Sequence, residues 1–571
     1  MELLTPHQSL QNWNVSLLLS EFAEAFPEKP AVHIPGKGTL SFSKLEGETR
    51  RWALEFERLG LKNGVRVATF VRPGFNFVPA IFAMYRLGAV PVFIDPGMTL
   101  KNMLACVQES KCEAMVGIPL AFLLKTFKPK YFQSIQTAIC ISNSTFWKKL
   151  FKTLFFIKPV SEETAVDLVD VELRSVRANK DQLASILFTS GSTGVPKGVE
   201  VTFGILWGQQ KILREAFDIK EDEVDMTPFP LFALFSAAWG ITCVVPDMNP
   251  AKPSQCSGKK LAKTMLDYGV THTAGSPAIW ANVLKYAQKE NITFPDLQRI
   301  LMAGAPVSEK IIRGWRRILP ESGHVYTPYG ATEALPVSMI RDVELINECY
   351  ALTNKGRGTC VGKPMGDVRI KIVPIEDGPM DHIDSVPTLK PYEIGEVVVQ
   401  GTLVTKKYFH RARATDLAKI NDWDKSTPGF WHRMGDVGYL DDQGRLWFCG
   451  RKDHRVPLAT GKTLYPVQVE PLFNQMVGVR RTALVGVSSS HESVLSIVGK
   501  KPVLMVEVEP SELKMSKDQL KTRLLQLAQS DVLTKEIHEV LFVKEFPTDV
   551  RHNIKINRPL LAEIAQRELQ I

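Results

Sequence analysis

The segment SILFTSGSTGVPKGVE (residues 185–200) begins as a short apolar run and then changes to threonine, serine and glycine around one lysine. Small residues let several backbone N–H groups converge on one point, and hydroxyl groups add further donors. Lys197 supplies a compact positive charge shortly after Thr189, Ser190, Gly191, Ser192, Thr193 and Gly194. These features predict a loop that holds a polyphosphate at the end of a buried strand.

The spacing of this loop differs from the P-loop pattern G-x-x-x-x-G-K-[ST], because Val195 and Pro196 separate the last glycine from the lysine. The alternative is a flexible Ser/Gly linker. Linkers do not usually follow a buried apolar strand or contain Pro-Lys-Gly, so the pattern favours a phosphate site of another ATP-dependent chemistry.

The first two thirds of the chain alternate short apolar runs with amphipathic stretches, which is typical of parallel sheets covered by helices. The runs that we expect to be strands are RVATFV, VPVFID, DQLASILFTS, EVDMTPFPL, THTAGSP and QRILMAGAPVS, and FVPAIFAMYRLG is an expected helix. This alternation of strands and helices occurs twice along the chain, so the sequence predicts a doubly wound α/β architecture.

The pattern changes after Gly366 to VRIKIV, GEVVVQG and RLWFCG, short strands that predict a small antiparallel barrel or sheet. Past Arg451 it changes again, to two strands within residues 481–509, the helix KDQLKTRLLQLAQ and the strand EVLFVKEFP. We therefore expect an N-terminal domain of residues 1–452, with two α/β subdomains and a small β-barrel subdomain, and an α+β domain of residues 453–571.

Composition excludes several classes of protein. The net charge of +9 is spread over 571 residues without long basic runs, so nucleic-acid binding gains little support. The eight cysteines form no C-x-x-C pair, which argues against zinc and redox motifs. The N-terminus lacks the pattern of a signal peptide, and the apolar stretch 229–245 contains proline and glycine and is expected to be core. These features predict a cytoplasmic protein.

One stretch has the pattern of a cationic amphipathic helix. In FWKKLFKTLFFIK (146–158), Trp147, Leu150, Phe151 and Leu154 share one side and three lysines lie on the other. The segment is either a surface helix docked on the core or a contact with the inner face of the membrane.

Four further motifs follow the loop in order: AGAP (303–306), YGATE (329–333), RMGDVGY (433–439) and GRKDH (450–454). Each alone is weak, because Tyr-Gly and Gly-Asp-x-Gly also occur in ordinary turns. Together with the loop they resemble the motif set of the adenylate-forming enzymes, the superfamily of acyl-CoA synthetases, luciferases and peptide-synthetase adenylation domains. The resemblance spans about residues 22–558.

This resemblance implies ATP and Mg²⁺ as cofactors and a role for each motif. Gly304, Ala305 and Pro306 would line the adenine, with Tyr329 and Gly330 against the base. Thr332 would lie near the phosphates and Glu333 would bind the metal. Asp436 would hold the ribose hydroxyls, Arg451 would lie near the nucleotide, and Asp453 would be the hinge of a mobile C-terminal lid.

The family also has a lysine near the C-terminus that bridges the carboxylate and the phosphates when the small domain closes. Here it corresponds to Lys555 in FPTDVRHNIKINR (546–558), where Ile554 replaces the usual glycine. The alternative is an exposed lysine at the start of a helix.

The segment PFPLFALFS would form the acyl pocket, with an apolar wall of Phe229, Phe232, Ala233 and Phe235 suited to a long alkyl chain; ordinary core packing is the alternative. Acyl-CoA synthetases commonly have a histidine at the position matched by Ala233. The alanine disfavours the usual CoA-dependent second step.

Three segments are most similar in sequence to olefin-pathway β-lactone synthetases, namely YGATEALPVS, FIDPGM (93–98) and VRHNIKI (550–556). The resemblance implies adenylation of a long-chain 2-alkyl-3-hydroxy acid and closure to a lactone, with other olefin-pathway enzymes as partners. A long-chain acyl-CoA or acyl-AMP ligase is the alternative on the same scaffold. A non-catalytic nucleotide-binding scaffold is disfavoured, because Lys197, Glu333, Asp436 and Lys555 are all present.

Overall fold

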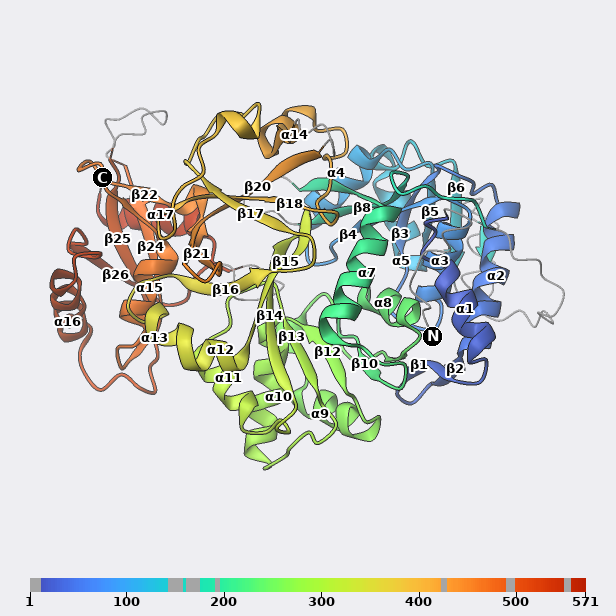
Figure 1. The fold of residues 1–571 in the computed structure, drawn as a ribbon, viewed down its shortest axis with the longest axis horizontal. Coiled ribbons are helices and arrows are strands. Elements are labelled where there is room, and N and C mark those ends of the chain that lie inside the picture. Colours follow the sequence, from blue (N-terminus) through green and yellow to red (C-terminus); the bar gives the residue numbers. More distant parts are fainter. Residues whose placement is uncertain are drawn as a thin grey trace.

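The fold was analysed in a computed structural model. It describes residues 12–141, 158–160, 175–189, 196–422, 429–488, 499–548 and 556–570, with only the backbone of residues 158–160 and 189. Figure 1 shows three regions in chain order: a blue to teal region, a green and yellow central region, and an orange to red region that ends in the C-terminus.

The first sheet has seven strands in the order β7-β6-β5-β3-β4-β8-β9. Neighbouring strands are parallel except for β8 and β9, which form an antiparallel hairpin. The strands are β3 (Arg66–Phe70), β4 (Val90–Ile94), β5 (Ala114–Gly117), β6 (Thr137–Ile141), β7 (Lys158–Val160), β8 (Leu183–Thr189) and β9 (Lys197–Thr202). The helices between them include α2 (Phe42–Arg58), α3 (Phe77–Arg86), α4 (Leu100–Ser110) and α5 (Pro119–Phe127).

The second sheet begins as another wound α/β unit. Its parallel strands are β1 (Pro30–Ile34), β10 (Val224–Met226), β11 (Thr242–Val244), β12 (His272–Gly275), β13 (Arg299–Met302) and β14 (His324–Ala331), with β2 (Gly38–Ser41) antiparallel at the edge. The associated helices are α1 (Leu17–Ala25), α7 (Phe203–Phe217), α8 (Phe232–Trp239), α9 (Gly258–Asp267), α10 (Pro277–Lys289) and α11 (Glu309–Arg316). The expected doubly wound architecture is confirmed.

An antiparallel extension continues this sheet beyond β14. Its strands are β15 (Ala334–Arg341), β16 (Thr359–Pro364), β17 (Arg369–Val373), β18 (Gly395–Gln400), β19 (Lys419–Asp422), β20 (Gly429–Leu440) and β21 (Leu446–Arg451). The short helices α12 (Asp342–Glu344), α13 (Tyr350–Thr353) and α14 (Ala412–Ala418) connect them. The strands expected in a small barrel are antiparallel, but β16 pairs with both β15 and β21 and joins them to the α/β sheet in one 14-stranded array.

The C-terminal strands form sheets of their own. A short ribbon of β22 (Val456–Pro457) and β23 (Thr463–Leu464) precedes the three-stranded sheet of β24 (Val479–Val487), β25 (Lys501–Val508) and β26 (Glu539–Val543). The helices here are α15 (Pro466–Asn474), α16 (Lys517–Ser530) and α17 (Arg558–Glu568). In α16, Ser516 and Gln519 form a capping box, which satisfies backbone N–H groups at the start of the helix.

The apolar stretch 229–245 folds as α8 followed by β11, and Gly240 ends the helix with φ of 71°. A side chain at this glycine would collide with Phe22, whose ring lies 2.3 Å from the position of an added Cβ atom. Among the described residues, no helix has the length and apolar character required to span a membrane. The stretch therefore contributes to the protein interior.

Candidate active site

A cavity of about 2960 Å³ lies where strands of both large sheets end. Its wall includes residues at or just after the carboxyl ends of β3, β4, β8, β12 and β13, namely Phe70, Asp95, Phe188, Ser276 and Ala303. Ligands of wound α/β sheets bind at such ends, because the connecting loops diverge there. Lys197, Glu333 and Asp436 line this same cavity.

The predicted phosphate loop connects β8 to β9. Thr189 pairs with Lys197 across the hairpin, so the ladder stops where the loop begins. Ser190, Gly191, Ser192, Thr193 and Gly194 lie outside the described residues, so their predicted role stays a prediction. The Lys197 Nζ atom is 4.9 Å from the centre of the Tyr408 ring, which lies on the same cavity wall.

Tyr408 joins Lys197 to Glu333. Its hydroxyl donates a 2.6 Å hydrogen bond to Glu333 Oε1, and burial followed by the Glu333 charge raises the pKa of this phenol. The Tyr408 segment is fixed by backbone bonds, from Phe409 N to Gly198 O (2.8 Å) and from Thr405 N to Glu333 O (2.8 Å). Sequence analysis missed Tyr408, because nothing in TKKYF distinguishes it from a packing tyrosine.

Glu333 and Thr332 form the turn between β14 and β15, and both line the cavity. Gly330 precedes them because the backbones approach closely; an added Cβ atom would lie 2.5 Å from Ala334 O. The described residues contain no cluster of three or more His, Cys, Asp or Glu side chains that could bind a metal. Mg²⁺ is often held by one or two carboxylates together with substrate phosphates, so the single carboxylate of Glu333 fits this metal.

Tyr329, Asp436 and Arg451 meet in a hydrogen-bonded group. Asp436 Oδ2 accepts a 2.6 Å bond from the Tyr329 hydroxyl, and Oδ1 accepts a 2.6 Å bond from Arg451 Nη1. The register of β20 and β21 places Asp436 directly opposite Arg451. Burial raises the pKa of Asp436, while Arg451 and the Tyr329 hydrogen bond oppose this shift. The group therefore provides a partly desolvated carboxylate at the cavity wall.

The segment 303–306 follows β13 and lies in the same wall. Gly304, Ala305 and Pro306 line the cavity, and Gly304 has φ of 91°, which favours glycine. The Tyr329 ring lies 6.0 Å from the ring of Phe448. A flat aromatic surface and an open backbone turn thus border one region of the cavity.

The C-terminal region also reaches the cavity. Asp453 lies in the short helical turn Lys452–His454, and burial, with smaller effects of Arg558 and Arg451, lowers the pKa of His454 to about 4. Lys555 lies outside the described residues. Its neighbour Ile556 forms a bridge with Thr548, and both of these residues line the cavity.

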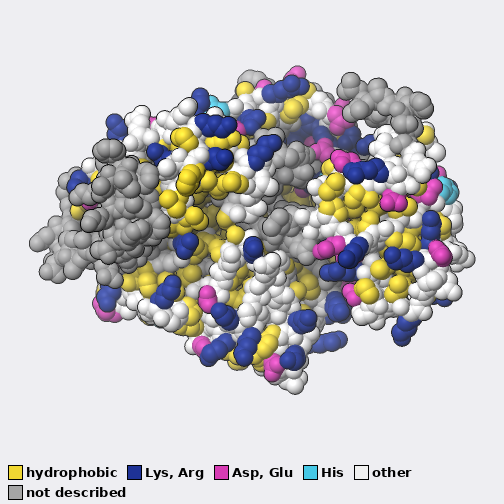
Figure 2. All heavy atoms as spheres, turned by 180° about the vertical axis from the view of Figure 1, so that it is seen from behind, with side chains coloured by type: hydrophobic (Ala, Val, Ile, Leu, Met, Phe, Trp, Pro, Cys, Tyr) yellow, Lys and Arg dark blue, Asp and Glu magenta, His cyan; other side chains and the backbone are white. Residues whose placement is uncertain are grey.

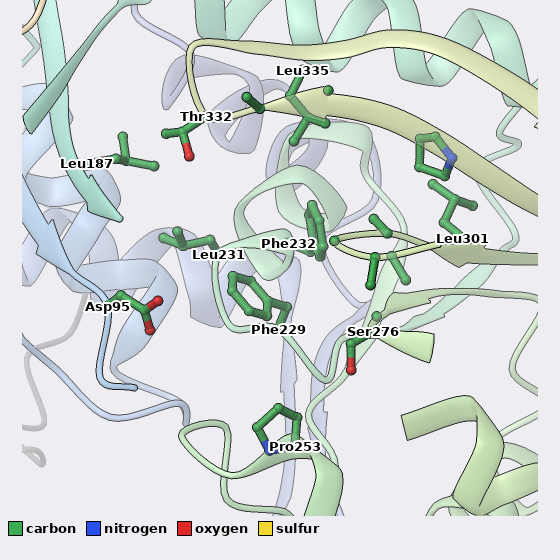
Figure 3. A pocket seen from close by; sticks show the side chains of 18 of the residues that line it. Asp95, Leu187, Phe229, Leu231, Phe232, Pro253, Ser276, Leu301, Thr332 and Leu335 are labelled. Carbon is green, nitrogen blue, oxygen red and sulfur yellow. The ribbon is translucent and has the colours of Figure 1, made fainter. Parts of the chain in front are cut away.

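The apolar wall comes from the segment before α8 and from α8 itself (Figure 3). The ring centres of Phe229 and Phe232 are 5.8 Å apart, and those of Phe232 and Phe235 are 6.1 Å apart. The structure corrects the assignment of Ala233, which is 2% exposed and packs in the core on another side of α8. Phe232, Leu234 and Phe235 of α8 line the cavity, whereas Ala233 does not.

A second group missed by sequence analysis lies near Glu333. Burial lowers the pKa of Lys419 to about 7, although the Glu333 charge opposes the shift, and Lys419 Nζ donates to Thr405 O. The pKa of His432 is well below its usual value, because the ring is buried and Lys419 lies near it. Neither residue belongs to a recognisable motif.

The wound sheets and the cavity at their carboxyl ends place this chain among α/β proteins that bind a ligand at a topological switch point. The family model described as AMP-binding enzyme matches residues 19–409. The chain belongs to the family of AMP-binding enzymes, and its expected membership of the adenylate-forming superfamily is confirmed.

Curated relatives match over nearly the whole chain. The olefin beta-lactone synthetase of Xanthomonas campestris pv. campestris is 37% identical over 560 residues, which cover 96% of this chain and 97% of the relative. The olefin beta-lactone synthetase of Stenotrophomonas maltophilia is 37% identical over 572 residues, with coverage of 98% and 99%. A 2-succinylbenzoate–CoA ligase of Oceanobacillus iheyensis is 23% identical, with coverage of 94% and 98%.

Solved structures show the same fold at lower identity. ATP-bound MatB from Rhodopseudomonas palustris has a TM-score of 0.75 at 19% identity, covering 98% of this chain and 100% of that chain. The O-succinylbenzoate coenzyme A synthetase MenE from Bacillus subtilis, in complex with AMP, has a TM-score of 0.71 at 21% identity, with coverage of 95% and 97%.

Proposed function

We propose that this enzyme activates a long-chain 2-alkyl-3-hydroxy acid with ATP and closes the resulting acyl-adenylate to a β-lactone. One observation carries the proposal: Tyr329, Glu333 and Asp436 line the same cavity as Phe229, Phe232 and Phe235. A nucleotide and an alkyl chain therefore have room to meet in one enclosure. The names of the relatives that are 37% identical agree with this chemistry.

In the first step the substrate carboxylate attacks the α-phosphorus of ATP and pyrophosphate leaves. Both reactants are anionic, so the site must neutralise charge and hold the attack in line. Lys197, the Ser190–Gly194 loop and Lys555 would provide positive charge and N–H donors. Mg²⁺ would supply further charge neutralisation when held by Glu333 and the phosphates.

In the second step the 3-hydroxyl oxygen attacks the acyl carbon, the C–O bond to AMP breaks, and the hydroxyl proton is released. No second substrate is required, and well-oriented intramolecular groups reach effective molarities of about 10⁵ M or more. This advantage offsets part of the strain of a four-membered ring.

We propose for the nucleotide the positions that the resemblance to the adenylate-forming enzymes implies. Asp436, held by Tyr329 and Arg451, would receive the ribose hydroxyls, and residues 303–306 would border the adenine. We also propose that residues 453–571 form a lid that moves about Asp453 and brings Lys555 to the reacting groups. The separate sheets of β22–β26 and the cavity contacts of Thr548 and Ile556 support this division.

A long-chain acyl-CoA or acyl-AMP ligase is the alternative, since 2-succinylbenzoate–CoA ligases are also similar to the chain. In both cases an acyl-adenylate forms first. To separate them, the protein is incubated with ATP, Mg²⁺ and a long-chain 2-alkyl-3-hydroxy acid, with and without CoA, and the products are identified by mass. A lactone formed without CoA supports the proposal. A thioester, formed equally well from plain fatty acids, would replace it with the ligase.

We propose no nucleic-acid partner, because Lys and Arg side chains occur at many separate places on the face shown in Figure 2 and form no continuous basic field there. A cytoplasmic location, contact with other olefin-pathway enzymes and a membrane contact through residues 146–158 stay predictions. Residues 146–157 lie outside the part of the chain that the structure describes.

A further inference from the structure

Helix α5 and the short turn Pro129–Tyr131 after it present apolar side chains to solvent. Phe127 is 75% exposed and Leu120 is 64% exposed, among the highest values for large apolar side chains in the described residues. Lys125, Lys128 and Lys130 accompany them, and we call these five residues the α5 surface. Exposed apolar side chains that gather in one place mark interaction sites more often than scattered ones do.

No acidic side chain in the described part of the chain forms an ion pair with the lysines of the α5 surface. Lys125 and Lys128 form no ion pair with any described residue, and Lys130 Nζ lies 5.0 Å from the centre of the Tyr131 ring. The sequence contains no Asp or Glu from Ala114 to Ser161, whereas it contains seven lysines there. Within the described residues, nothing therefore neutralises the lysines of the α5 surface.

Helix α9 provides an internal contrast. It also has three lysines and an exposed apolar side chain, Leu266, which is 41% exposed. Two of its three lysines are paired with carboxylates, however: Lys260 with Asp247 at 2.6 Å and Lys263 with Asp267 at 2.9 Å. The unpaired lysines thus distinguish α5 from an ordinary surface helix.

The α5 surface also adjoins the cavity. Ile118 and Leu120, at the start of the helix, line the cavity wall together with Asp95, and Leu120 is at the same time exposed to solvent. An apolar molecule that reaches this surface therefore meets the cavity without crossing a polar barrier formed by α5 itself.

We propose that the α5 surface docks the enzyme on an anionic lipid bilayer, with Leu120 and Phe127 inserted among the acyl chains and the three lysines facing the headgroups. Apolar side chains combined with unpaired lysines are the combination that binds an interface of this kind. The inference deepens the proposed function and rests on it, because a long-chain acid resides in membranes. Docking would place the cavity next to the store of its substrate.

The test is co-sedimentation of the full-length protein with vesicles, without ATP or acid. We expect binding to phosphatidylcholine vesicles that contain phosphatidylglycerol and at least tenfold weaker binding to pure phosphatidylcholine, since each lysine near an anionic surface contributes roughly fivefold. The double variant Leu120→Ser/Phe127→Ser should lose at least tenfold in binding. Leu266→Ser/Val532→Ser, which changes two exposed apolar residues elsewhere, is the matched control and should bind normally.

The charge is tested separately with Lys125→Gln/Lys128→Gln/Lys130→Gln. Its control, Lys259→Gln/Lys514→Gln/Lys544→Gln, removes the same net charge from exposed lysines elsewhere. We expect the first variant to lose most of its preference for anionic vesicles and the control to retain it. Equal loss in both would show a general charge effect and overturn the assignment to α5.

Two further outcomes would overturn the proposal. One is no vesicle binding by the unmodified protein. The other is a changed sedimentation coefficient of Leu120→Ser/Phe127→Ser together with unchanged vesicle binding. That result would show that the α5 surface is a contact between copies of the chain. Adenylation of a short, water-soluble 3-hydroxy acid without lipid tests the proposed function independently, so failure of docking and failure of the chemistry are distinguishable.

Discussion

The two ends of the cavity differ in the interactions that hold them together: hydrogen bonds and ion pairs at one end, and aromatic contacts at the other. At one end Tyr329, Asp436 and Arg451 form hydrogen bonds of 2.6 Å, and Tyr408 fixes Glu333 at 2.6 Å. At the other end Phe229 and Phe232 form an aromatic wall with ring centres 5.8 Å apart. The polar end is directional and depends on each partner, whereas the apolar end depends on shape and area.

This difference sets the cost of change at each end. A buried polar group that loses its partner costs the full desolvation penalty, because water cannot replace the partner. An apolar wall that loses one ring retains its neighbours and loses only contact area. We therefore expect changes at the polar end to abolish the reaction and changes at the apolar end to alter which acid is accepted.

The largest effect is expected for Lys555→Ala. Two unit charges about 4 Å apart attract by roughly 4 kcal/mol at an effective dielectric near 20, so adenylation should slow by roughly several hundredfold. Binding of ATP, measured by calorimetry, should be nearly unchanged, because the role proposed for this lysine is in the reacting complex and not in holding the nucleotide. Lys544→Ala, an exposed lysine of the same region, is the control. Equal loss of binding and rate would assign Lys555 a structural role.

The second largest effect is expected for Asp436→Ala. It leaves the Arg451 guanidinium and the Tyr329 hydroxyl without their shared acceptor, and roughly 3 kcal/mol of lost stabilisation corresponds to at least about a hundredfold loss in kcat/KM for ATP. Asp442→Ala is the matched control, because Asp442 accepts a 2.7 Å bond from the exposed Tyr392 hydroxyl. Similar pyrophosphate release by both variants would contradict the role of the polar end.

Glu333→Gln should raise the Mg²⁺ concentration required for half-maximal pyrophosphate release by about tenfold, since a neutral amide is a poorer magnesium ligand. Tyr408→Phe removes the 2.6 Å hydrogen bond that orients this carboxylate and should cause a smaller shift in the same direction. A magnesium titration identical to that of the unmodified enzyme would remove Glu333 from the metal site.

At the apolar end, Phe232→Ala should lower kcat/KM for the best acid by about tenfold and shift the preference towards bulkier acids, because a ring lost from a pocket changes discrimination by roughly 1–3 kcal/mol. Ala233→Val should instead lower the free energy of unfolding by about 1–3 kcal/mol through overpacking, with the preference unchanged. A panel of acids of increasing chain length distinguishes the two. If Ala233→Val changed the preference among the acids, Ala233 would have to line the acyl pocket.

The smallest effect on activity is expected from Asp225→Asn, behind the apolar wall, where Ser236 of α8 donates a 2.7 Å bond to Asp225 Oδ2. Burial raises the pKa of Asp225 to about 7, whereas the unfolded chain ionises near the ordinary value of 3.8. The folded state thus loses stability as pH rises from about 4 to 7, by up to about 1.4 kcal/mol per pH unit.

Denaturant unfolding at several pH values measures this effect. The unmodified protein should lose free energy of unfolding as pH rises from about 4 to 7, whereas Asp225→Asn should not show this loss. The difference in free energy of unfolding, variant minus unmodified protein, should therefore increase over this interval. Asp247→Asn is the opposite control, because Lys260 lowers the pKa of Asp247 and its contribution is lost as pH falls. A constant difference between Asp225→Asn and the unmodified protein would show that Asp225 is already ionised in the folded state.

Much of the fold could be predicted from the sequence. The run RVATFV became β3, GEVVVQG became β18 and KDQLKTRLLQLAQ became α16, because each pattern is local and repeats with the period of its element. The extent of the second sheet could not be predicted. The joining of β16 to both β15 and β21 depends on pairing between strands far apart in the chain.

The same distinction applies to the site. The sequence by itself identified Lys197 through the residue types of its loop, and it identified Glu333, Asp436 and Arg451 through the resemblance of their motifs to those of a known family. Only the tertiary structure showed that Tyr408 holds Glu333, that Lys419 lies partly buried near it, and that Ala233 packs in the core. The physical reason is that a motif records local geometry, whereas the direction of a side chain and its pKa depend on what the rest of the chain packs against it.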